Sequence, residues 1–369
     1  MQKTKDLVLG IDTSNYTTSV ALADPYRNAI RDERILLTVK QGERGLRQSN
    51  ALFQHQENLP KLLHRVLPEY RDRIGAVSVS SRPRPVEGSY MPVFLAGCQT
   101  GKILADAFGV PYFEFSHQEG HLKAASFTTG LTWNEPYLAW HLSGGTCELL
   151  LVRPEHSCPE EERITIIGGS LDISFGQLLD RFGVAMELQF PCGKALDQMA
   201  LAARDHWKEE RSLKKESLFK PVSRKGFEFN LSGLETQSLR ALESEAIAPE
   251  LLVYDLFEEI CRILHKVTTK AVEETKVSQV LFTGGVSASL YVRDRWTELQ
   301  NKKNALKFKS VFGAPVHSSD NAVGTAILGG ERIWDYNRSA YPDLTLTLNE
   351  FSSPILFWEM FRSLEKSRI

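Results

Sequence analysis

The chain has 369 residues, of which 42% are hydrophobic and 24% charged, and its formal net charge is −2. This composition is typical of a globular protein long enough for two domains, and the bulk charge does not indicate a nucleic-acid binder. The net charge does not exclude a local basic patch, because the chain contains 44 Lys and Arg residues that could gather on one face. Five scattered cysteines without a C-x-x-C pair argue against a disulfide framework and fit a reducing, cytoplasmic location. We find no signal peptide and no apolar run near the ~18 residues of a membrane span, so no membrane association is expected.

The first residues predict a β-hairpin with an acidic residue at its turn. DLVLGID is an apolar run rich in β-forming residues and ends at Asp12. The polar turn TSNYTT and a second apolar run, SVALAD, follow it. As a candidate catalytic residue, Asp12 is either a base or a polar support in the turn.

Two helical patterns come next. Apolar residues recur at helical spacing over residues 49–67, where Pro60 predicts a break or a kink. Residues 91–109 read as a second, buried helix that ends at Gly109.

Residues 115–125, FSHQEGHLKAA, contain two histidines four positions apart. On a helix, His117 and His121 lie on one face and can present nitrogens to a single ion. The zinc-protease pattern H-E-x-x-H does not match, because Glu119 is two positions from the first histidine and points to another side. A metallopeptidase is therefore not expected. From the pair alone, a metal site and two structural histidines are both open.

The second half contains a similar hairpin and a third strand with a glycine turn. In PYLAWHLSGGTCELLLV the turn is formed by Ser143, Gly144 and Gly145, and the later strand VLFT runs into Gly284 and Gly285. Glycines directly after a strand let backbone N–H groups approach a phosphate closely, although a plain turn explains each one taken singly.

The alternation of strand pairs, a parallel-type strand and helices predicts an α/β fold. We expect an N-terminal subdomain over residues 1–130 and a second subdomain over residues 131–330. The polar stretch at about 205–245 is interpreted as an insertion or a substrate loop, and the aromatic-rich segment 331–369 is expected to pack back on the first subdomain.

Taken together, six segments resemble a known family. In chain order they are SHQEGH, LSGGT, LLDRFGV…FPCG, NLSGLET, FTGGVSAS and SSDNAVGTAI. The ordered set resembles the TsaD-type tRNA threonylcarbamoyl-adenosine synthase family, once called glycoproteases, over about residues 7–330. The resemblance implies the duplicated actin/Hsp70-like (ASKHA) fold, in which two subdomains enclose a nucleotide and metal cleft.

The resemblance also implies the residues of both sites. The family holds a metal with the two histidines of H-x-E-G-H and the aspartate of a D-N motif, which here are His117, His121 and Asp320. Imidazole plus carboxylate suits one iron or zinc ion. An adenine nucleotide or acyl-adenylate is expected in the cleft, and its implied contacts are Ser143, Gly144, Gly145, Asp180, Gly193, Gly284, Gly285 and Ser289.

Family members transfer the threonylcarbamoyl group of threonylcarbamoyl-AMP to the exocyclic amine of an adenosine beside the tRNA anticodon. The metal is expected to act as a Lewis acid on the carbamoyl–phosphate unit. The implied partners are the acyl-adenylate, tRNA, and a TsaB-like subunit or a second copy of the chain.

Several positions depart from the family pattern. Where the family has a glycine-rich loop, this chain has SRPRP, so Arg82 and Arg84 can clamp an anion in place of backbone N–H groups. A stiff solvated loop is the alternative. The other departures are Thr146, Gln177, Glu235 and Ser289. We therefore interpret the chain as a divergent paralogue; a small-molecule carbamoyltransferase and a non-catalytic partner subunit of the tRNA-modification complex are the alternatives.

Overall fold

The computed structural model describes residues 5–14, 16–24, 28–39, 46–131, 134–154, 157–159, 162–214, 217–303 and 305–340, with only the helical backbone over 205–214 and 334–340. Residues 341–369 therefore lie outside the described part, and with them most of the segment that was expected to pack back on the first subdomain.

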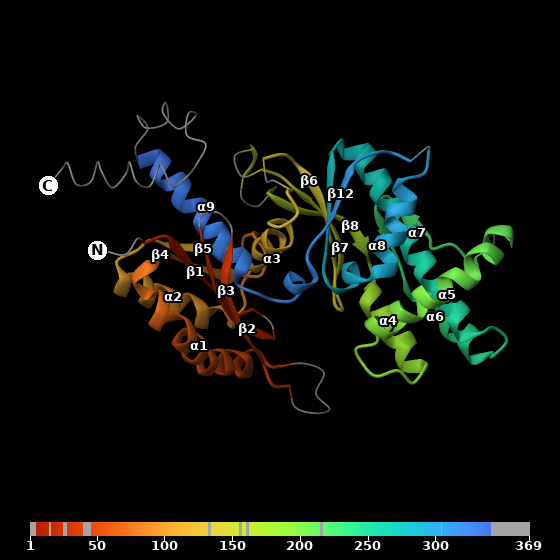
Figure 1. Ribbon diagram of the computed structural model, residues 1–369, viewed down its shortest axis with the longest axis horizontal. Helices are drawn as coiled ribbons and strands as arrows, with labels where there is room; N and C mark the ends of the chain where they lie inside the picture. The colour runs from red at the N-terminus through yellow and green to blue at the C-terminus, as the bar shows by residue number, and fades with distance from the viewer. Residues whose placement is uncertain are drawn as a thin grey trace.

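Each half of the chain forms one β-sheet, and helices surround both sheets (Figure 1). The first sheet has the order β3-β2-β1-β4-β5. Its strands are β1 (Leu7–Asp12), β2 (Thr17–Ala23), β3 (Ala29–Leu36), β4 (Ile74–Arg82) and β5 (Tyr112–Ser116). The first three strands are antiparallel, whereas β4 and β5 continue the sheet parallel to β1.

The second sheet has the order β12-β11-β6-β7-β8-β10-β9. Its strands are β6 (Tyr137–Leu142), β7 (Cys147–Val152), β8 (Ile164–Ser170), β9 (Arg224–Lys225), β10 (Glu228–Phe229), β11 (Gln279–Thr283) and β12 (Lys309–Phe312). Strands β6, β7 and β8 are antiparallel, and β11 and β12 run parallel to β6. Apart from the short β9–β10 hairpin, β8-β7-β6-β11-β12 repeats the topology of the first sheet, so the fold is duplicated.

Alternation along β1 explains how helices cover both faces of the first sheet. Leu9 and Ile11 belong to the core under α1 (Gln48–Tyr70) and α2 (Phe94–Phe108). Gly10 faces the opposite side, where a Cβ atom would lie 2.5 Å from the carbonyl oxygen of Ala322, just before α9 (Val323–Ala340). Helix α9 thereby returns the end of the described chain to the first sheet.

Of the break or kink predicted at Pro60, the break is wrong, because α1 runs through this residue without interruption, and the kink stays a prediction. The helix tolerates this proline because it is long and packs Leu59, Leu62 and Val66 into the core of the first half.

In the second half, Trp140 and Phe282 pack beneath the long helix α7 (Pro249–Thr275). The other helices of this side are α4 (Phe175–Ala185), α5 (Gly193–Lys214), α6 (Ser232–Glu243) and α8 (Leu290–Gln300). The stretch at about 205–245 contains regular structure, namely the end of α5, the β9–β10 hairpin and α6, joined by irregular segments such as residues 217–223. Its assignment as an insertion or a substrate loop stays a prediction.

Helix α3 (His117–Ser126) connects the halves, since Leu122 and Ala125 pack with Tyr137 and Leu281 of the second sheet. Its other side contacts α9 and the first sheet. All five cysteines are free thiols. Within the described residues, no helix combines the length and apolar character needed to cross a bilayer.

Candidate metal centre and adjoining glycine turns

The candidate metal site lies at one edge of the first sheet. Strands β1, β4 and β5 are parallel, so their carboxyl ends meet at the same edge. Asp12 ends β1, Ser80 lies near the end of β4, and Ser116 ends β5 directly before α3. Open α/β sheets place their ligand sites at such edges.

A capping box fixes the start of α3. The Ser116 hydroxyl accepts the backbone N–H of Glu119 at 3.2 Å, and the Glu119 carboxylate accepts the Ser116 N–H at 2.8 Å. Glu119 is also paired with Arg163 at 3.2 Å. This glutamate is therefore a structural residue, while His117 and His121 share one helix face with ring centroids 4.2 Å apart.

Two glycines bring α9 close enough to place Asp320 beside the histidines. A Cβ at Gly324 would lie 1.9 Å from the carbonyl oxygen of Gly120, and one at Gly120 would lie 2.7 Å from the Thr325 hydroxyl. The preceding turn is held by Asn321, whose side-chain oxygen accepts the Val323 N–H at 3.0 Å. Larger residues at either glycine would separate the helices.

The structure brings together the three residues that the sequence assigned to a metal. The Asp320 Oδ1 atom lies 3.1 Å from His121 Nε2 and 3.5 Å from His117 Nε2. One ligand atom from each of the three residues falls within 4.8 Å of the others. Two imidazole nitrogens and one carboxylate oxygen form a donor set that fits zinc or iron.

Asp12 contacts this cluster through the ring nitrogen of His117 that is not directed to Asp320. Its Oδ2 atom lies 2.8 Å from His117 Nδ1 and accepts the Ser80 hydroxyl at 2.6 Å, while Oδ1 accepts the N–H and hydroxyl of Ser14 at 2.9 and 2.5 Å. With Nδ1 bound in this way, Nε2 of His117 is directed to Asp320. A carboxylate behind a metal-binding histidine fixes its tautomer and orientation.

The electrostatics of the site follow from this pairing. Burial disfavours a charged imidazole, but the carboxylates of Asp12 and Asp320 outweigh it and raise the pKa of His117 to about 10. Burial likewise opposes ionisation of Asp12 and Asp320, yet the histidines lower the pKa of both carboxyl groups. A bound cation would replace the proton on His117.

The glycine turns occupy the corresponding edge of the second sheet, because β6 and β11 are adjacent and parallel. A Cβ at Gly144, Gly145 or Gly285 would meet no atom within 4 Å, so the backbone there borders open space. Gly284 differs, since its φ is +93° and a Cβ would lie 2.3 Å from the carbonyl oxygen of Leu142. The Ser143 N–H is bound to the Thr146 carbonyl at 2.8 Å.

Of the remaining predicted nucleotide contacts, Asp180 lies within α4, whereas Gly193 and Ser289 lie at the starts of α5 and α8. Asp180 Oδ1 accepts the Cys192 N–H at 2.8 Å, immediately before Gly193 at the start of α5. Ser289 donates to Asp197 at 2.5 Å and accepts the Val292 N–H at 3.1 Å. Their assignment to a nucleotide stays a prediction.

The SRPRP loop is bound to both halves. Arg84 Nη2 lies 2.7 Å from Glu148 Oε1 on β7, and the Pro83 carbonyl accepts the Gln118 N–H at 3.1 Å. Arg82 donates to the Ser81 hydroxyl at 3.1 Å. The anion clamp predicted for the two arginines therefore has a competitor, since Glu148 already binds one guanidinium group.

Two other departures from the family pattern also have structural partners. Gln177 completes a capping box with Ser174 at the start of α4. Glu235 binds Arg181 through both carboxylate oxygens, at 3.1 and 3.2 Å.

The sequence analysis missed His141. This residue lies on β6 opposite Glu148, and its ring centroid is 5.7 Å from that of His121. Burial, and then the neighbouring His121 and His117, lower the pKa of His141 to about 3. The available signal was an imidazole in the otherwise apolar strand YLAWHL, two positions before Ser143.

The repeated sheet topology, with side-chain ligands at one strand edge and glycine turns at the other, defines a protein of the actin-like ASKHA class. The chain belongs to the TsaD family, described as tRNA N6-adenosine threonylcarbamoyltransferase, whose sequence model matches residues 36–326. This range includes His117, His121 and Asp320 but leaves Asp12 outside it.

Individual relatives agree with this assignment. The chain is 28% identical to a tRNA N6-adenosine threonylcarbamoyltransferase of Ligilactobacillus salivarius, over 94% of this chain and 96% of that one. It is 29% identical to one of Limosilactobacillus fermentum, over 92% and 97%. Among solved structures, T. kodakarensis HypF is similar in fold with a TM-score of 0.53 and 14% identity, over 89% of this chain and 48% of that one.

Proposed function

We propose that this protein transfers a threonylcarbamoyl or related carbamoyl group from an acyl-adenylate, with the adenosine amine of tRNA as the family acceptor. The observation that carries the proposal is the meeting of His117, His121 and Asp320, which come from α3 and from the turn before α9. Folding places these ligands together over about 200 residues of chain, inside the range that matches the family.

We assign the metal to these three ligands and a positioning role to Asp12. When bound, an iron or zinc ion supplies a Lewis acid for the carbonyl and phosphate oxygens of the donor. Asp12 holds the Nδ1 proton of His117 and so keeps Nε2 available as a ligand. Both carboxylate oxygens of Asp12 already accept hydrogen bonds from the groups that surround them. This argues against a role of Asp12 as a base.

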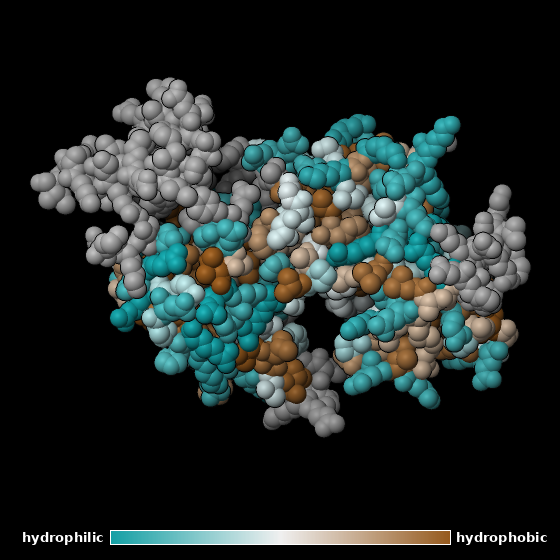
Figure 2. All heavy atoms as spheres, viewed as in Figure 1, coloured by the Kyte–Doolittle hydropathy of each residue, from teal (hydrophilic) through white to brown (hydrophobic). Residues whose placement is uncertain are grey.

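We assign the nucleotide to the corresponding strand-end edge of the second sheet, where the glycine turns lie. The backbone at Gly144 and Gly285 borders open space and would offer N–H groups to phosphate, whereas the Gly145 N–H already donates to the Ser143 hydroxyl oxygen at 3.3 Å. We assign the remaining nucleotide contacts to Ser143, Gly284, Asp180, Gly193 and Ser289. Figure 2 shows an opening between the two halves of the molecule. A donor that spans it would have its phosphate near the glycine turns and its carbamoyl group toward the histidines.

The proposal is tested by supplying the donor and following its product. The purified protein, loaded with iron or zinc, is mixed with threonylcarbamoyl-AMP and an unmodified tRNA transcript, with and without a TsaB-like subunit. Mass spectrometry of the digested RNA should detect threonylcarbamoyl-adenosine. Loss of the donor without RNA product would support the second candidate, a small-molecule carbamoyltransferase.

A third outcome would point to the partner-subunit alternative. If the protein leaves the donor unconsumed but raises the activity of a standard family enzyme, its own catalysis is refuted. We place the activity in the cytoplasm, in keeping with the free thiols.

A further inference from the structure

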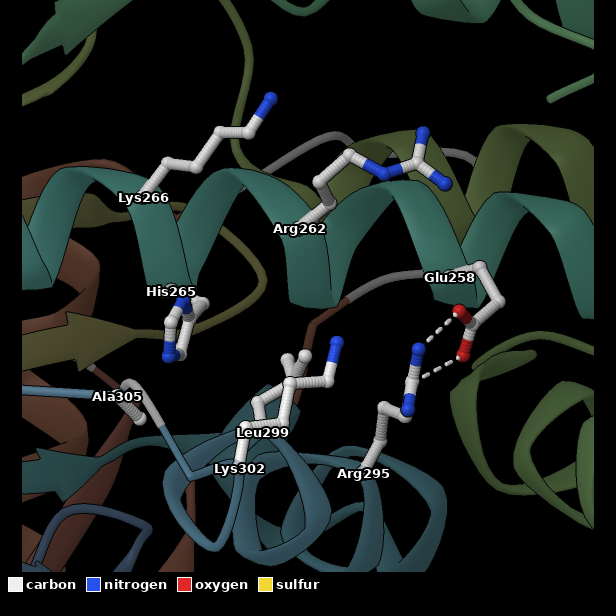
Figure 3. A pocket seen from close by; sticks show the side chains of 8 residues that line it. All are labelled: Glu258, Arg262, His265, Lys266, Arg295, Leu299, Lys302 and Ala305. Carbon is white, nitrogen blue, oxygen red and sulfur yellow. Dashed lines mark hydrogen bonds and ion pairs between the residues drawn. The ribbon is translucent and has the colours of Figure 1, made fainter. Parts of the chain in front are cut away.

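A second site lies between α7 and α8, on the helical side of the second half. It is a cavity of about 480 Å³. Its lining is mostly basic and consists of Glu258, Arg262, His265, Lys266, Arg295, Leu299, Lys302 and Ala305 (Figure 3). Arg262 and Lys266 rise from α7 in this view, whereas His265 points below the helix, toward Ala305 and Lys302.

The acidic groups at this cavity already have hydrogen-bond and ion-pair partners. Arg295 holds Glu258 through two contacts, Nε to Oε1 at 2.7 Å and Nη2 to Oε2 at 2.8 Å, and Tyr291 donates to the same carboxylate at 2.8 Å. The other guanidinium contact of Arg295 goes to Glu298 at 2.8 Å. The only carboxylate among the described lining residues is thus paired with Arg295, which also contacts Glu298, while Arg262 pairs with Glu259.

Two lysines of the lining are left without a counter-ion. Within the part of the chain that the structure describes, neither Lys266 nor Lys302 forms an ion pair, and both are exposed. The buried Nε2 atom of His265, between them, has no hydrogen-bond partner among the described residues. Burial and the nearby charges of Lys302 and Arg295 lower the pKa of His265. The two exposed lysines therefore offer positive charge to an anion at this cavity.

The chain that follows α8 extends this charge. From residue 299 to residue 319 the sequence contains Lys302, Lys303, Lys307 and Lys309 and no aspartate or glutamate. Lys307 lies beside the end of α8, where its Nζ donates to the carbonyl oxygens of Gln300 and Lys302, whereas Lys309 is directed to the Gly130 carbonyl. A strand of phosphates matches this arrangement better than a single small anion does, because Lys303 and Lys307 follow the cavity residue Lys302 along the chain.

We propose that the cavity between α7 and α8 binds backbone phosphates of the RNA acceptor, at a position separate from the metal centre. This inference rests on the proposed function, since it takes the family acceptor as its ligand. The lysines would hold the body of the RNA, while the site at the first sheet acts on the adenosine. Contacts of this kind give affinity without sequence specificity.

The test compares two double variants with the same loss of charge. The cavity variant is Lys266→Gln with Lys302→Gln. The control is Lys61→Gln with Lys102→Gln, two exposed lysines of the first half. Affinity for an unmodified tRNA transcript is measured across a series of salt concentrations, and melting temperatures verify that both variants fold. We expect the cavity variant to bind at least roughly tenfold more weakly at low salt, with a salt slope smaller by roughly 2.

Each outcome decides the question. Equal affinities and slopes for the cavity and control variants would overturn the inference alone, whereas a wild-type protein that binds no tRNA would overturn the proposed acceptor as well. Calorimetry with pyrophosphate separates the sources of phosphate. If the cavity variant loses pyrophosphate binding but keeps RNA affinity and salt slope, the cavity serves a small phosphate ligand and the RNA assignment is wrong.

Discussion

The two sheets have the same topology, yet their strand-end edges carry opposite chemistry. At the end of β1 the edge holds Asp12, buried among hydroxyl groups and an imidazole. At the end of β6 the equivalent edge holds the turn Ser143–Thr146, whose two glycines border open space. The first edge therefore presents side-chain ligands suited to a cation, whereas the second is the edge at which we propose that backbone N–H groups bind an anion.

Under the proposed function, this difference would let one repeated scaffold serve a metal-assisted group transfer. A buried carboxylate needs several hydrogen-bond donors, which makes the first edge rigid and fixes His117. At the second edge, a Cβ on Gly144, Gly145 or Gly285 would enter open space, so there is room beside the turns. The halves are thus not interchangeable, and each can be disrupted separately.

The largest effect is expected at the first edge. The double substitution His117→Ala with His121→Ala removes two of three ligands, so metal content should fall from about one equivalent to none. Elemental analysis of the purified protein measures this directly. His64→Ala, at an exposed position of α1, is the control and should keep its metal. Equal metal in the wild-type and double-variant proteins would show that the cluster is structural.

At the second edge, two glycines should respond in opposite ways. Gly284→Ala places a Cβ against the Leu142 carbonyl at a residue with φ of +93°, so the free energy of unfolding should fall by about 3 kcal/mol or more. Gly144→Ala adds a methyl group to open space and should change stability by less than about 0.5 kcal/mol, while it weakens nucleotide binding. Denaturant unfolding and calorimetry with AMP measure the two. Unchanged nucleotide affinity in Gly144→Ala would remove the phosphate assignment.

Much of this contrast was visible in the sequence. The i,i+4 histidines, the two hairpins and the glycine turns are local patterns that predicted the α/β fold and made His117 and His121 metal candidates. The third ligand, Asp320, came only from the resemblance to the TsaD family. The partner of Arg84 was not visible, because Glu148 lies on a strand of the other half. His141 was missed for a related reason, since only the packing of α3 on the second sheet turns that strand position into a neighbour of His121.

Substitution of the support behind His117 should have a smaller effect than loss of a ligand. In Asp12→Asn the amide group would donate to Nδ1, so the ring would carry its proton on Nε2, where it cannot bind metal. Metal affinity should fall about 10- to 100-fold. Ser80→Ala removes another hydrogen bond to the same carboxylate oxygen and is the matched control. If both variants bind metal equally well, Asp12 does not set the tautomer.

Metal binding should also depend on pH in a defined direction. Because the pKa of His117 is raised to about 10, the metal must displace a proton at neutral pH. The apparent affinity should therefore rise about tenfold per pH unit between about pH 7 and pH 9 and level off above the raised pKa. Calorimetry in buffers of different ionisation enthalpy should detect release of about one proton. An affinity that does not vary over this range would contradict the assigned protonation.

The smallest effect is expected where the two edges are joined, at Arg84 and Glu148. The pair is partly exposed, with 45% of the arginine and 20% of the glutamate side chain accessible, so a double-mutant cycle should give a coupling below about 1 kcal/mol in stability. The effect of substituting either residue on catalysis distinguishes a structural link between the two halves from an anion-binding site. If Arg84 binds the donor, Arg84→Ala should raise the KM for threonylcarbamoyl-AMP, while Glu148→Gln should lower it by releasing the guanidinium group. Equal, small changes in both variants would leave the loop as a support for α3 through the Pro83 carbonyl.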